Sequence, residues 1–280
     1  MPKMTAAQYK TKVEPVWCPG CGDFGVLNAL CNSLAAQDVD PKNTVFVSGI
    51  GCSGRLPPYV KSYGFHTVHG RVLPIATGIK VANPDLTVVA VGGDGDAFAI
   101  GGGHIPHMSR RNPSIVYIVM DNGTYGLTKG QASPTGPLGM KTGASPYGTI
   151  EPPLNPIAMA LAYDISFVAR GYSGKNKELE ALITRAMNHR GFSLIDVISP
   201  CITFYNTYKD LPPQLAAIPE THDVKDRAKA FELALKEDKI YLGTFYENDR
   251  PTFEDRLRGV VDQSEASGIP KLDEIFLDFA

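Results

Sequence analysis

The stretch Leu86-Thr-Val-Val-Ala-Val-Gly-Gly-Asp-Gly95 decides the fold of this chain. Residues 86–91 form an apolar run, which is typical of a strand buried on both faces of a parallel sheet. A glycine-rich turn follows the run, and a helix is predicted over residues 98–110. Glycines at this place let backbone N–H groups approach a phosphate, and the start of a helix favours negative charge. The stretch therefore predicts a ligand site at the carboxyl edge of an open α/β sheet.

Asp94 adds a carboxylate that by itself would repel a phosphate. The repulsion disappears if Asp94 holds a divalent cation that also binds the phosphate oxygens. A second apolar run, residues 115–120, ends in Asp121-Asn122. Adjacent parallel strands would bring Asn122 beside Asp94, and its amide oxygen is a suitable second ligand for magnesium. The turn at 123–126 offers a backbone carbonyl as a third.

Strands and helices alternate over the first two thirds of the chain, which predicts an α/β fold with a parallel sheet flanked by helices. The predicted strands are 44–47, 86–91, 115–120, 167–169 and 194–198, and the predicted helices are 24–34, 75–82, 98–110, 156–163 and 177–188.

We expect residues 1–202 to form one domain. Residues 203–280 are more charged and carry few signals of buried strands, although 224–235 reads as a helix. They predict a C-terminal arm that packs on the domain or on a partner. Residues 131–156 are rich in Pro, Gly, Ser and Thr and predict a long excursion, which in a compact domain is usually functional or disordered.

The composition restricts the partners and the compartment. The chain has 280 residues, a formal net charge of -2 and 43% hydrophobic residues. A near-neutral charge disfavours nucleic acid and anionic membranes as partners. No apolar run has the length of a membrane helix, and the first nine residues lack the apolar core of a signal peptide. We therefore expect a cytoplasmic protein.

Five cysteines in a reducing compartment point away from a disulfide framework. Cys18 and Cys21 form a CxxC pair, while Cys52 and Cys201 each follow a predicted strand. Four separate thiols suit a [4Fe–4S] cluster. Zinc competes, although its sites usually carry two CxxC pairs, and a redox-active CxxC is a third possibility. Cys31 lies inside the first helix, where a small buried hydrophobic residue is the better interpretation.

A formal GxGxxG pattern occurs at Gly49, Gly51 and Gly54, after a predicted strand. The dinucleotide-binding motif opens a helix and needs an acidic residue about 20 positions later. Pro57 and Pro58 follow almost at once, and no Asp or Glu occurs between Gly54 and Asp85. This excludes a nicotinamide site.

The GDG sequence followed within thirty residues by an asparagine resembles the thiamine diphosphate motif. The resemblance implies that Asp94, Asn122 and the carbonyl of Thr124 bind Mg²⁺. The usual motif has Asn-Asn where this chain has Asp121-Asn122. That departure is mild because the second position holds the metal.

A larger set of motifs, in one order along residues 15–205, is similar to the beta subunit of 2-oxoacid:ferredoxin oxidoreductases. The set is Trp17-Cys-Pro-Gly-Cys21, Ile50-Gly-Cys-Ser53, His69-Gly-Arg71, Gly93-Asp-Gly95 and Asp121-Asn-Gly-Thr-Tyr-Gly-Leu-Thr128. The resemblance implies a [4Fe–4S] cluster on Cys18, Cys21, Cys52 and Cys201. It also implies cofactor contacts from Ile50, Gly51, Cys52, Ser53, His69, Gly93, Gly95, Asp96, Tyr125, Gly126 and Leu127.

This resemblance implies oxidative decarboxylation of a 2-oxoacid with coenzyme A to acyl-CoA and CO2, with electrons passing through the cluster to ferredoxin. The cofactor supplies the chemistry and the protein supplies position and electrostatics. Thiamine enzymes also use a Glu against the aminopyrimidine, on a second domain for which this chain is too short. In the resembling family that domain belongs to an alpha subunit, so we expect a heterodimer whose beta chain is inactive alone.

Lys129 follows the cofactor-binding turn, and a cation there suits a substrate with a second carboxylate, such as 2-oxoglutarate, ahead of pyruvate. Arg55 and Arg71 are further possible anion contacts, whereas His104 and His107 suit helix packing or the surface better than a metal. Two alternatives remain, a non-oxidative thiamine diphosphate enzyme subunit and a metal-stabilised non-catalytic partner subunit. The cysteine set argues against the first, and the intact Asp94 and Asn122 against the second.

Overall fold

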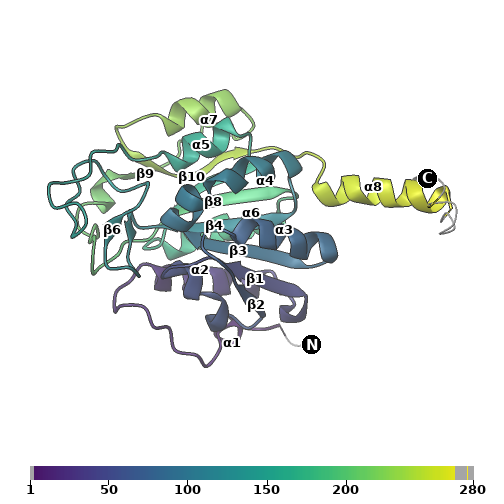
Figure 1. The fold of residues 1–280 in the computed structure, drawn as a ribbon. Helices are drawn as coiled ribbons and strands as arrows, with labels where there is room; N and C mark the ends of the chain where they lie inside the picture. The colour runs from purple at the N-terminus through teal and green to yellow at the C-terminus, as the bar shows by residue number, and fades with distance from the viewer. Residues whose placement is uncertain (1–2, 269–275, 277–280) are drawn as a thin grey trace.

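The structure is a computed structural model that describes residues 3–268 and Phe276. The strands of its main sheet are β1 (Thr44–Ser48), β2 (Tyr63–His66), β3 (Thr87–Gly93), β4 (Ile115–Asp121), β7 (Phe167–Tyr172), β8 (Phe192–Ile198), β9 (Leu215–Ala217) and β10 (Ile240–Glu247). They lie in the order β2-β1-β3-β4-β8-β7-β10-β9 (Figure 1).

The central strands of this sheet are parallel, as predicted. β3 lies between β1 and β4, and its last residue, Gly93, pairs with Met120. Every residue from 88 to 92 and from 115 to 120 is buried, which explains why these strands read as continuous apolar runs. The carboxyl ends of β1, β3 and β4 therefore meet at one edge.

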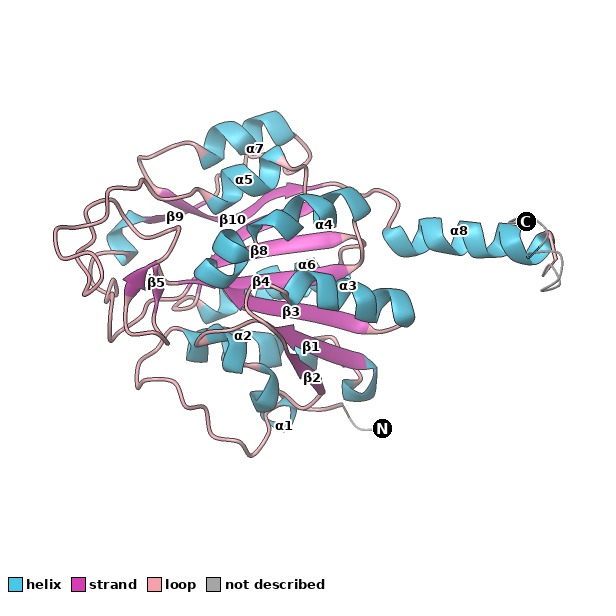
Figure 2. Cartoon of the chain, viewed as in Figure 1, coloured by secondary structure: helices cyan, strands magenta, loops and turns pink. Residues whose placement is uncertain are grey.

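Helices cover both faces of the sheet (Figure 2). Side chains of a strand alternate between its faces, so Val89 and Val91 pack with one group of helices and Val88 and Ala90 with the other. The first group is α1 (Ala6–Tyr9), α2 (Asp23–Ala36) and α6 (Asn176–Asn188); the second is α3 (Val72–Ala82), α4 (Ile105–Arg111), α5 (Pro156–Ala162) and α7 (Arg227–Ala234).

The prediction of one continuous helix over residues 98–110 is wrong, because three short helical elements occupy this region. A π-helical turn, η4 (Gly95–Ile100), begins at the last residue of the GDG sequence, and the 3-10 turn η5 (Gly102–His104) separates it from α4. Gly101 lies so close to the backbone of η4 that an added Cβ would stand 2.3 Å from the carbonyl oxygen of Asp96. π-Helical turns of this kind frequently mark functional sites.

The prediction that few strands follow residue 203 is also wrong. β10 pairs antiparallel with β7 and parallel with β9, so both strands extend the main sheet. Only α8 (Phe253–Ala266) fits the predicted arm, because it projects away from the rest of the chain and has no buried residue (Figure 1).

The excursion over 131–156 begins with β6 (Gln131–Ala132), which pairs with β5 (Thr124–Tyr125) in a two-stranded ribbon. No residue from 133 to 155 belongs to a helix or strand. β2, an exposed edge strand, is not among the strands that the sequence predicted. In the part of the chain that the structure describes, none of the helices has the length and apolar character needed to cross a bilayer.

Candidate functional site

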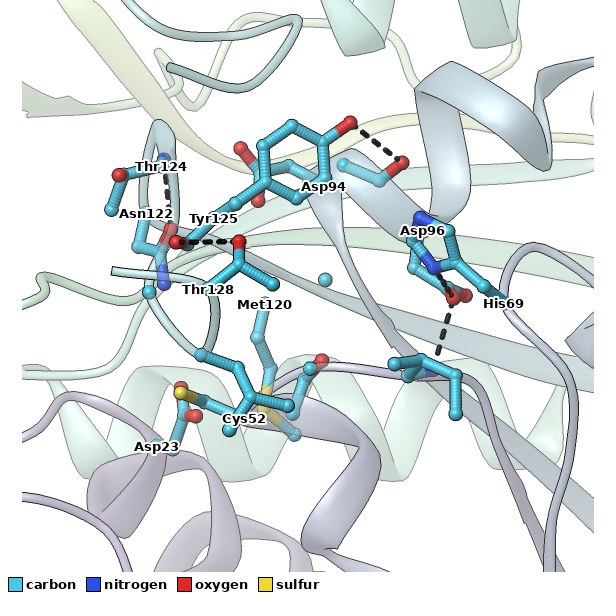
Figure 3. A pocket seen from close by; sticks show the side chains of 17 residues that line it. Asp23, Cys52, His69, Asp94, Asp96, Met120, Asn122, Thr124, Tyr125 and Thr128 are labelled. Carbon is cyan, nitrogen blue, oxygen red and sulfur yellow. Dashed lines mark hydrogen bonds and ion pairs between the residues drawn. The ribbon is translucent and has the colours of Figure 1, made fainter. Parts of the chain in front are cut away.

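A cavity lies at the carboxyl ends of β1, β3 and β4 (Figure 3). It is lined by Asp23, Ile50, Gly51, Cys52, Ser53, His69, Gly93, Asp94, Gly95, Asp96, Met120, Asn122, Thr124, Tyr125, Gly126, Leu127 and Thr128. All the residues predicted to contact the cofactor are among them, as are the three predicted magnesium ligands. Segments that lie far apart in the chain thus line the same cavity.

Asp94 stands at the end of β3 and is 2% exposed. Its Oδ2 accepts hydrogen bonds from the hydroxyls of Ser133 and Thr135, the latter at 2.6 Å. Both donors belong to the excursion that follows β6, so this long loop has a defined role at the site. Burial raises the pKa of Asp94 above its ordinary value, against the effect of the two hydroxyls.

Asn122 follows β4 on the neighbouring strand end. Its Oδ1 accepts a hydrogen bond from the backbone N–H of Thr124 at 2.9 Å, which closes the turn between β4 and β5 (Figure 3). The side chains of Asp94 and Asn122 and the backbone of Thr124 therefore reach the cavity together. This is the arrangement that the sequence predicted for the ends of two adjacent strands.

A second carboxylate, that of the half-buried Asp121, lies next to Asp94. The hydroxyl of Thr135 is 2.6 Å from Oδ2 of Asp94 and 2.7 Å from Oδ1 of Asp121, so a single hydroxyl hydrogen serves two carboxylates. Burial raises the pKa of Asp121 well above its ordinary range, and the nearby carboxylates of Asp94 and Asp196 raise it further. A divalent cation at Asp94 would offset this excess of negative charge, so the residues present fit a metal.

Gly95 is required by its contact with Tyr125. A Cβ at this position would stand 2.1 Å from the Tyr125 ring, whose hydroxyl lies 3.4 Å from the Gly95 carbonyl oxygen. The backbone of the GDG turn is therefore in direct contact with the β5 turn. Glycine here allows the two walls of the cavity to approach each other.

Asp96 joins two further loops. Its Oδ1 accepts hydrogen bonds from the backbone N–H of Ile50 at 3.0 Å, from that of Gly70 at 2.8 Å, and from Nδ1 of His69 at 2.8 Å (Figure 3). Asp96 is 2% exposed. A carboxylate acceptor at Nδ1 fixes the ring orientation of His69 and leaves Nε2 as the free nitrogen. Asp96 and His69 both line the cavity, but Asp96 acts mainly by holding in place the loops that carry Ile50 and His69.

The cysteine segments meet beside the same cavity, which Cys52 lines. The CxxC turn is closed by a hydrogen bond from the N–H of Cys21 to the carbonyl of Cys18, and the N–H of Gly22 donates to the carbonyl of Pro200. The indole N–H of Trp17 donates to the carbonyl of Cys52 at 2.7 Å. A Cβ added at Gly126 would stand 3.5 Å from Sγ of Cys52 and 3.7 Å from Sγ of Cys201.

These thiols are not arranged as a finished metal site. Within residues 3–268, no three His, Cys, Asp or Glu side chains are grouped so that they could hold a metal ion as they stand. Burial raises the pKa of Cys52 to about 11 and that of Cys21 still further, and Asp23 adds to both effects. Partly buried thiols of this kind stay protonated at neutral pH unless a metal binds them and stabilises the thiolate form. The four sulfur donors therefore fit a metal cluster, although their side chains would have to reorient around it.

The comparisons agree with this geometry. Residues 49–197 match the family model described as "Thiamine pyrophosphate enzyme, C-terminal TPP binding domain", and residues 201–262 match the model for the C-terminal part of the pyruvate ferredoxin oxidoreductase beta chain. A 2-oxoacid:ferredoxin oxidoreductase 2 subunit beta from Aeropyrum pernix is 43% identical over 90% of this chain and 87% of its own. The chain belongs to the family of 2-oxoacid:ferredoxin oxidoreductase beta subunits.

Two other relatives show the same likeness. A 2-oxoglutarate synthase subunit KorB from Methanothermobacter marburgensis is 36% identical over 91% of this chain and 90% of its own. A solved structure of 2-oxoglutarate:ferredoxin oxidoreductase from Magnetococcus marinus, with 2-oxoglutarate, coenzyme A and succinyl-CoA bound, has a TM-score of 0.94 and 42% identity, covering 100% of this chain and 97% of that one. The predicted family and fold are confirmed, and the chain is a subunit of an oxidoreductase.

Some site residues of this family member were not singled out by the sequence. Ser133 and Thr135 contact Asp94 across about 40 positions, and no local pattern marks them. Asp23 lines the cavity and is 1% exposed, although it reads only as an acidic residue at the start of a helix. Burial raises the pKa of Asp23 to about 6, whereas the Ser199 hydroxyl acts to lower it.

The remaining candidates lie apart from the cavity wall. Lys129 is exposed and has a φ of 75°, which is uncommon for a residue other than glycine. Arg55 is exposed, while Arg71 donates to the carbonyl of Ile100 at 3.3 Å. His104 is half-buried and His107 exposed, as expected for packing and surface positions, and Cys31 is fully buried in the core.

Proposed function

We propose that this beta subunit binds thiamine diphosphate through Mg²⁺, holds a [4Fe–4S] cluster, and oxidises 2-oxoglutarate with coenzyme A in complex with an alpha subunit, with ferredoxin as the electron acceptor. The observation that carries the proposal is that one cavity is lined both by proposed magnesium ligands and by a proposed cluster ligand. Asp94 and Asn122 line it on one side, and Cys52 lines it on another. A cofactor bound there would stand directly beside a cluster ligand.

Asp94, Asn122 and the carbonyl of Thr124 are the proposed magnesium ligands. A carboxylate, an amide oxygen and a backbone carbonyl are the hard oxygen donors that Mg²⁺ prefers. Ser133 and Thr135 would orient the Asp94 carboxylate, as hydrogen-bonding neighbours of a metal ligand do. Gly93 and Gly95 leave the backbone open to the diphosphate.

Cys18, Cys21, Cys52 and Cys201 are the proposed cluster ligands. The bound groups supply the reactive chemistry, since thiamine diphosphate supplies carbanion chemistry for decarboxylation and the cluster accepts single electrons. The chain itself positions the two groups. The Trp17 indole fixes the backbone of Cys52, and the hydrogen bond from Gly22 to Pro200 holds the CxxC turn against the segment of Cys201.

Asp96 and His69 control the other end of the cavity. Asp96 holds His69 in the tautomer with a proton on Nδ1, so Nε2 is the nitrogen free to accept a hydrogen bond from the cofactor or the substrate. The same carboxylate ties down both loops that bound the cavity near Ile50 and Gly70. A fixed donor and acceptor pattern of this kind orients bound groups before reaction.

A partner is needed to complete the site. Among the residues that line the cavity in the described part of the chain, the acidic ones are Asp23, Asp94 and Asp96, and none is a Glu. Next to His69 the surface carries exposed apolar side chains, with Val68 72%, Ile75 41% and Ile100 50% exposed. An apolar surface beside an incomplete active site favours a permanent partner, and we assign it to the alpha subunit.

The relatives named for 2-oxoglutarate favour that substrate over pyruvate. Lys129 supports the same choice, because it follows directly on the turn that lines the cavity and would bring a cation beside a substrate bound there.

The proposal is tested by co-expressing the chain with its alpha subunit and purifying the complex without oxygen. A brown complex with iron, sulfide and acid-extractable thiamine diphosphate, which reduces ferredoxin fastest with 2-oxoglutarate, is expected. A colourless zinc protein would exclude the cluster. Decarboxylation without transfer of electrons to any acceptor would instead favour a non-oxidative thiamine enzyme.

A further inference from the structure

Asp23 is a buried acidic residue between the two proposed cofactors. It is the first residue of α2, two positions after Cys21, and its side chain lines the cavity with Cys52 (Figure 3). It is 1% exposed, and within the described residues no Lys, Arg or His lies within ion-pair distance of it. A buried carboxylate without a cationic partner is costly. A favourable interaction with the start of α2 does not by itself explain why this carboxylate is buried.

The contacts of Asp23 lead to two cluster ligands. The Ser199 hydroxyl donates to Oδ1 of Asp23 at 2.6 Å, and Ser199 lies two residues before Cys201. The CxxC turn ends at Cys21, two positions before Asp23, and the N–H of Gly22 between them donates to the carbonyl of Pro200 at 3.1 Å. One side chain thus ties the CxxC turn to the end of β8.

The same junction leaves little freedom for the two segments. A Cβ at Gly22 would stand 2.6 Å from Oγ of Ser199 and 2.8 Å from the backbone nitrogen of Pro200. The N–H of Ser199 also donates to the carbonyl of Asp121 at 2.7 Å, which connects this junction to the end of β4. The Asp23 carboxylate is therefore held against the segment that carries Cys201, and this junction is tied to the end of β4.

We infer that Asp23 is a positioning residue for the cluster, which fixes Cys21 relative to Cys201 and lowers the reduction potential of the cluster with its negative charge. This inference rests on the proposed cluster. A carboxylate beside a ligand stabilises the oxidised form, because reduction adds a negative charge to the same low-dielectric region. A low potential keeps the reduced cluster able to pass its electron on to ferredoxin.

The test compares variants of the co-expressed holoenzyme by redox titration monitored by electron paramagnetic resonance at pH 8. Asp23→Asn removes the charge but keeps an acceptor for Ser199, and we expect the midpoint potential to rise. Ser199→Ala removes the donor that offsets the carboxylate, and we expect the midpoint potential to fall. Glu254→Gln is the matched control, because Glu254 is a half-buried carboxylate at the far end of the sheet, where its Oε1 accepts from the N–H of Ser114.

Shifts of opposite sign in the two variants, with the control unchanged, would support the inference, since a merely structural defect would not reverse its sign. Wild-type potentials in both variants would overturn it, as would shifts of the same sign. If Asp23→Asn loses its iron, Ser199→Ala decides the question alone. A wild-type complex without iron and sulfide would instead refute the proposed function, and that result is separate because it precedes any variant.

Discussion

At the scale of single residues, Asp94 places a buried carboxylate beside a second one. Asp94 is 2% exposed, and a single hydroxyl, that of Thr135, separates it from the half-buried carboxylate of Asp121. Neither has a Lys or Arg partner in the described residues, although Asp196 behind them pairs with Arg170 at 2.9 Å. A Mg²⁺ ion at the proposed site would offset this unpaired negative charge.

Asp94→Asn should weaken binding of Mg²⁺ and thiamine diphosphate by about 100-fold or more, because loss of even an outer-shell partner of a metal ligand costs about 10–100-fold. Calorimetric titration with the two ligands together measures the loss. Asp85→Asn is the control, since Asp85 is an exposed carboxylate before the opposite end of β3. Equal affinities of Asp94→Asn and wild type would refute the assignment of the metal ligand.

Lys129→Ala should raise the KM for 2-oxoglutarate more than the KM for pyruvate, because only the dicarboxylic substrate loses a charge-assisted contact. Steady-state rates of ferredoxin reduction with both oxoacids measure the difference. Lys141→Ala serves as the control, since Lys141 is an exposed lysine of the 131–156 excursion. An equal effect of Lys129→Ala on both substrates would remove the argument for a role in specificity.

At the scale of elements, the turn from β3 into η4 depends on close backbone contacts. Gly95→Ala would place a methyl group 2.1 Å from the Tyr125 ring, so the β5 turn must move. We expect a loss of about 1–3 kcal/mol of stability, typical of overpacking, together with weaker binding of thiamine diphosphate. Thermal unfolding with and without the cofactor measures both effects.

Gly102→Ala provides the comparison for Gly95→Ala, because a Cβ at Gly102 meets nothing within 4 Å. Its unfolding temperature and cofactor binding should stay close to those of the wild type. A Gly95→Ala protein that behaved like Gly102→Ala would show that the two walls of the cavity are not packed as described.

His189, just after α6, gives the fold a dependence on pH. Its ring is buried, and Nε2 lies 2.9 Å from Oγ of Ser166. Nδ1 has no hydrogen-bond partner among the described residues, although the carboxylates of Glu247 and Asp249 lie 3.9 and 3.8 Å from it. Burial lowers the pKa of His189 below its ordinary value of 6.5, although Glu247 and Asp249 oppose the effect. The neutral ring therefore stabilises the fold above pH 6.5, and this stability is lost as pH falls through the folded-state value.

The contribution of His189 should reach a slope of at most about 1.4 kcal/mol per pH unit, the value for one proton. Unfolding by urea between pH 5 and 7.5 measures it, and His189→Gln should be less sensitive to acid than the wild type. His107→Gln changes an exposed histidine and should leave the slope unaltered. Parallel pH profiles for wild type and His189→Gln would contradict this explanation.

At the scale of the whole molecule, the sequence predicted the features that depend on neighbouring residues or on the alternation of strands and helices. The apolar runs of β3 and β4 are buried on both faces, so their class and order could be predicted, and Asp94 and Asn122 followed because they end those strands. β10 could not be found in this way, since Gly243 and the polar Thr244 interrupt its apolar run and its pairing with β7 joins residues about 75 positions apart.

The same limit applies to the site. Ser133 and Thr135 act on Asp94 from a segment without regular structure, and only the folded chain brings them there. Asp23 was not singled out in the sequence, because its burial depends on β8 and on Ser199, far along the chain. Contacts that join distant segments decide these roles, and one sequence contains no signal for them.

The central claim is that one cavity couples thiamine-dependent decarboxylation to a cluster on Cys18, Cys21, Cys52 and Cys201. The most direct measurement is the electron paramagnetic resonance spectrum of the anaerobic complex with its alpha subunit after addition of 2-oxoglutarate and coenzyme A, with no other reductant. The account predicts the signal of a reduced [4Fe–4S] cluster, which Cys52→Ser abolishes and which the isolated beta subunit never gives. A complex that holds thiamine diphosphate but shows no cluster signal with any 2-oxoacid would contradict it.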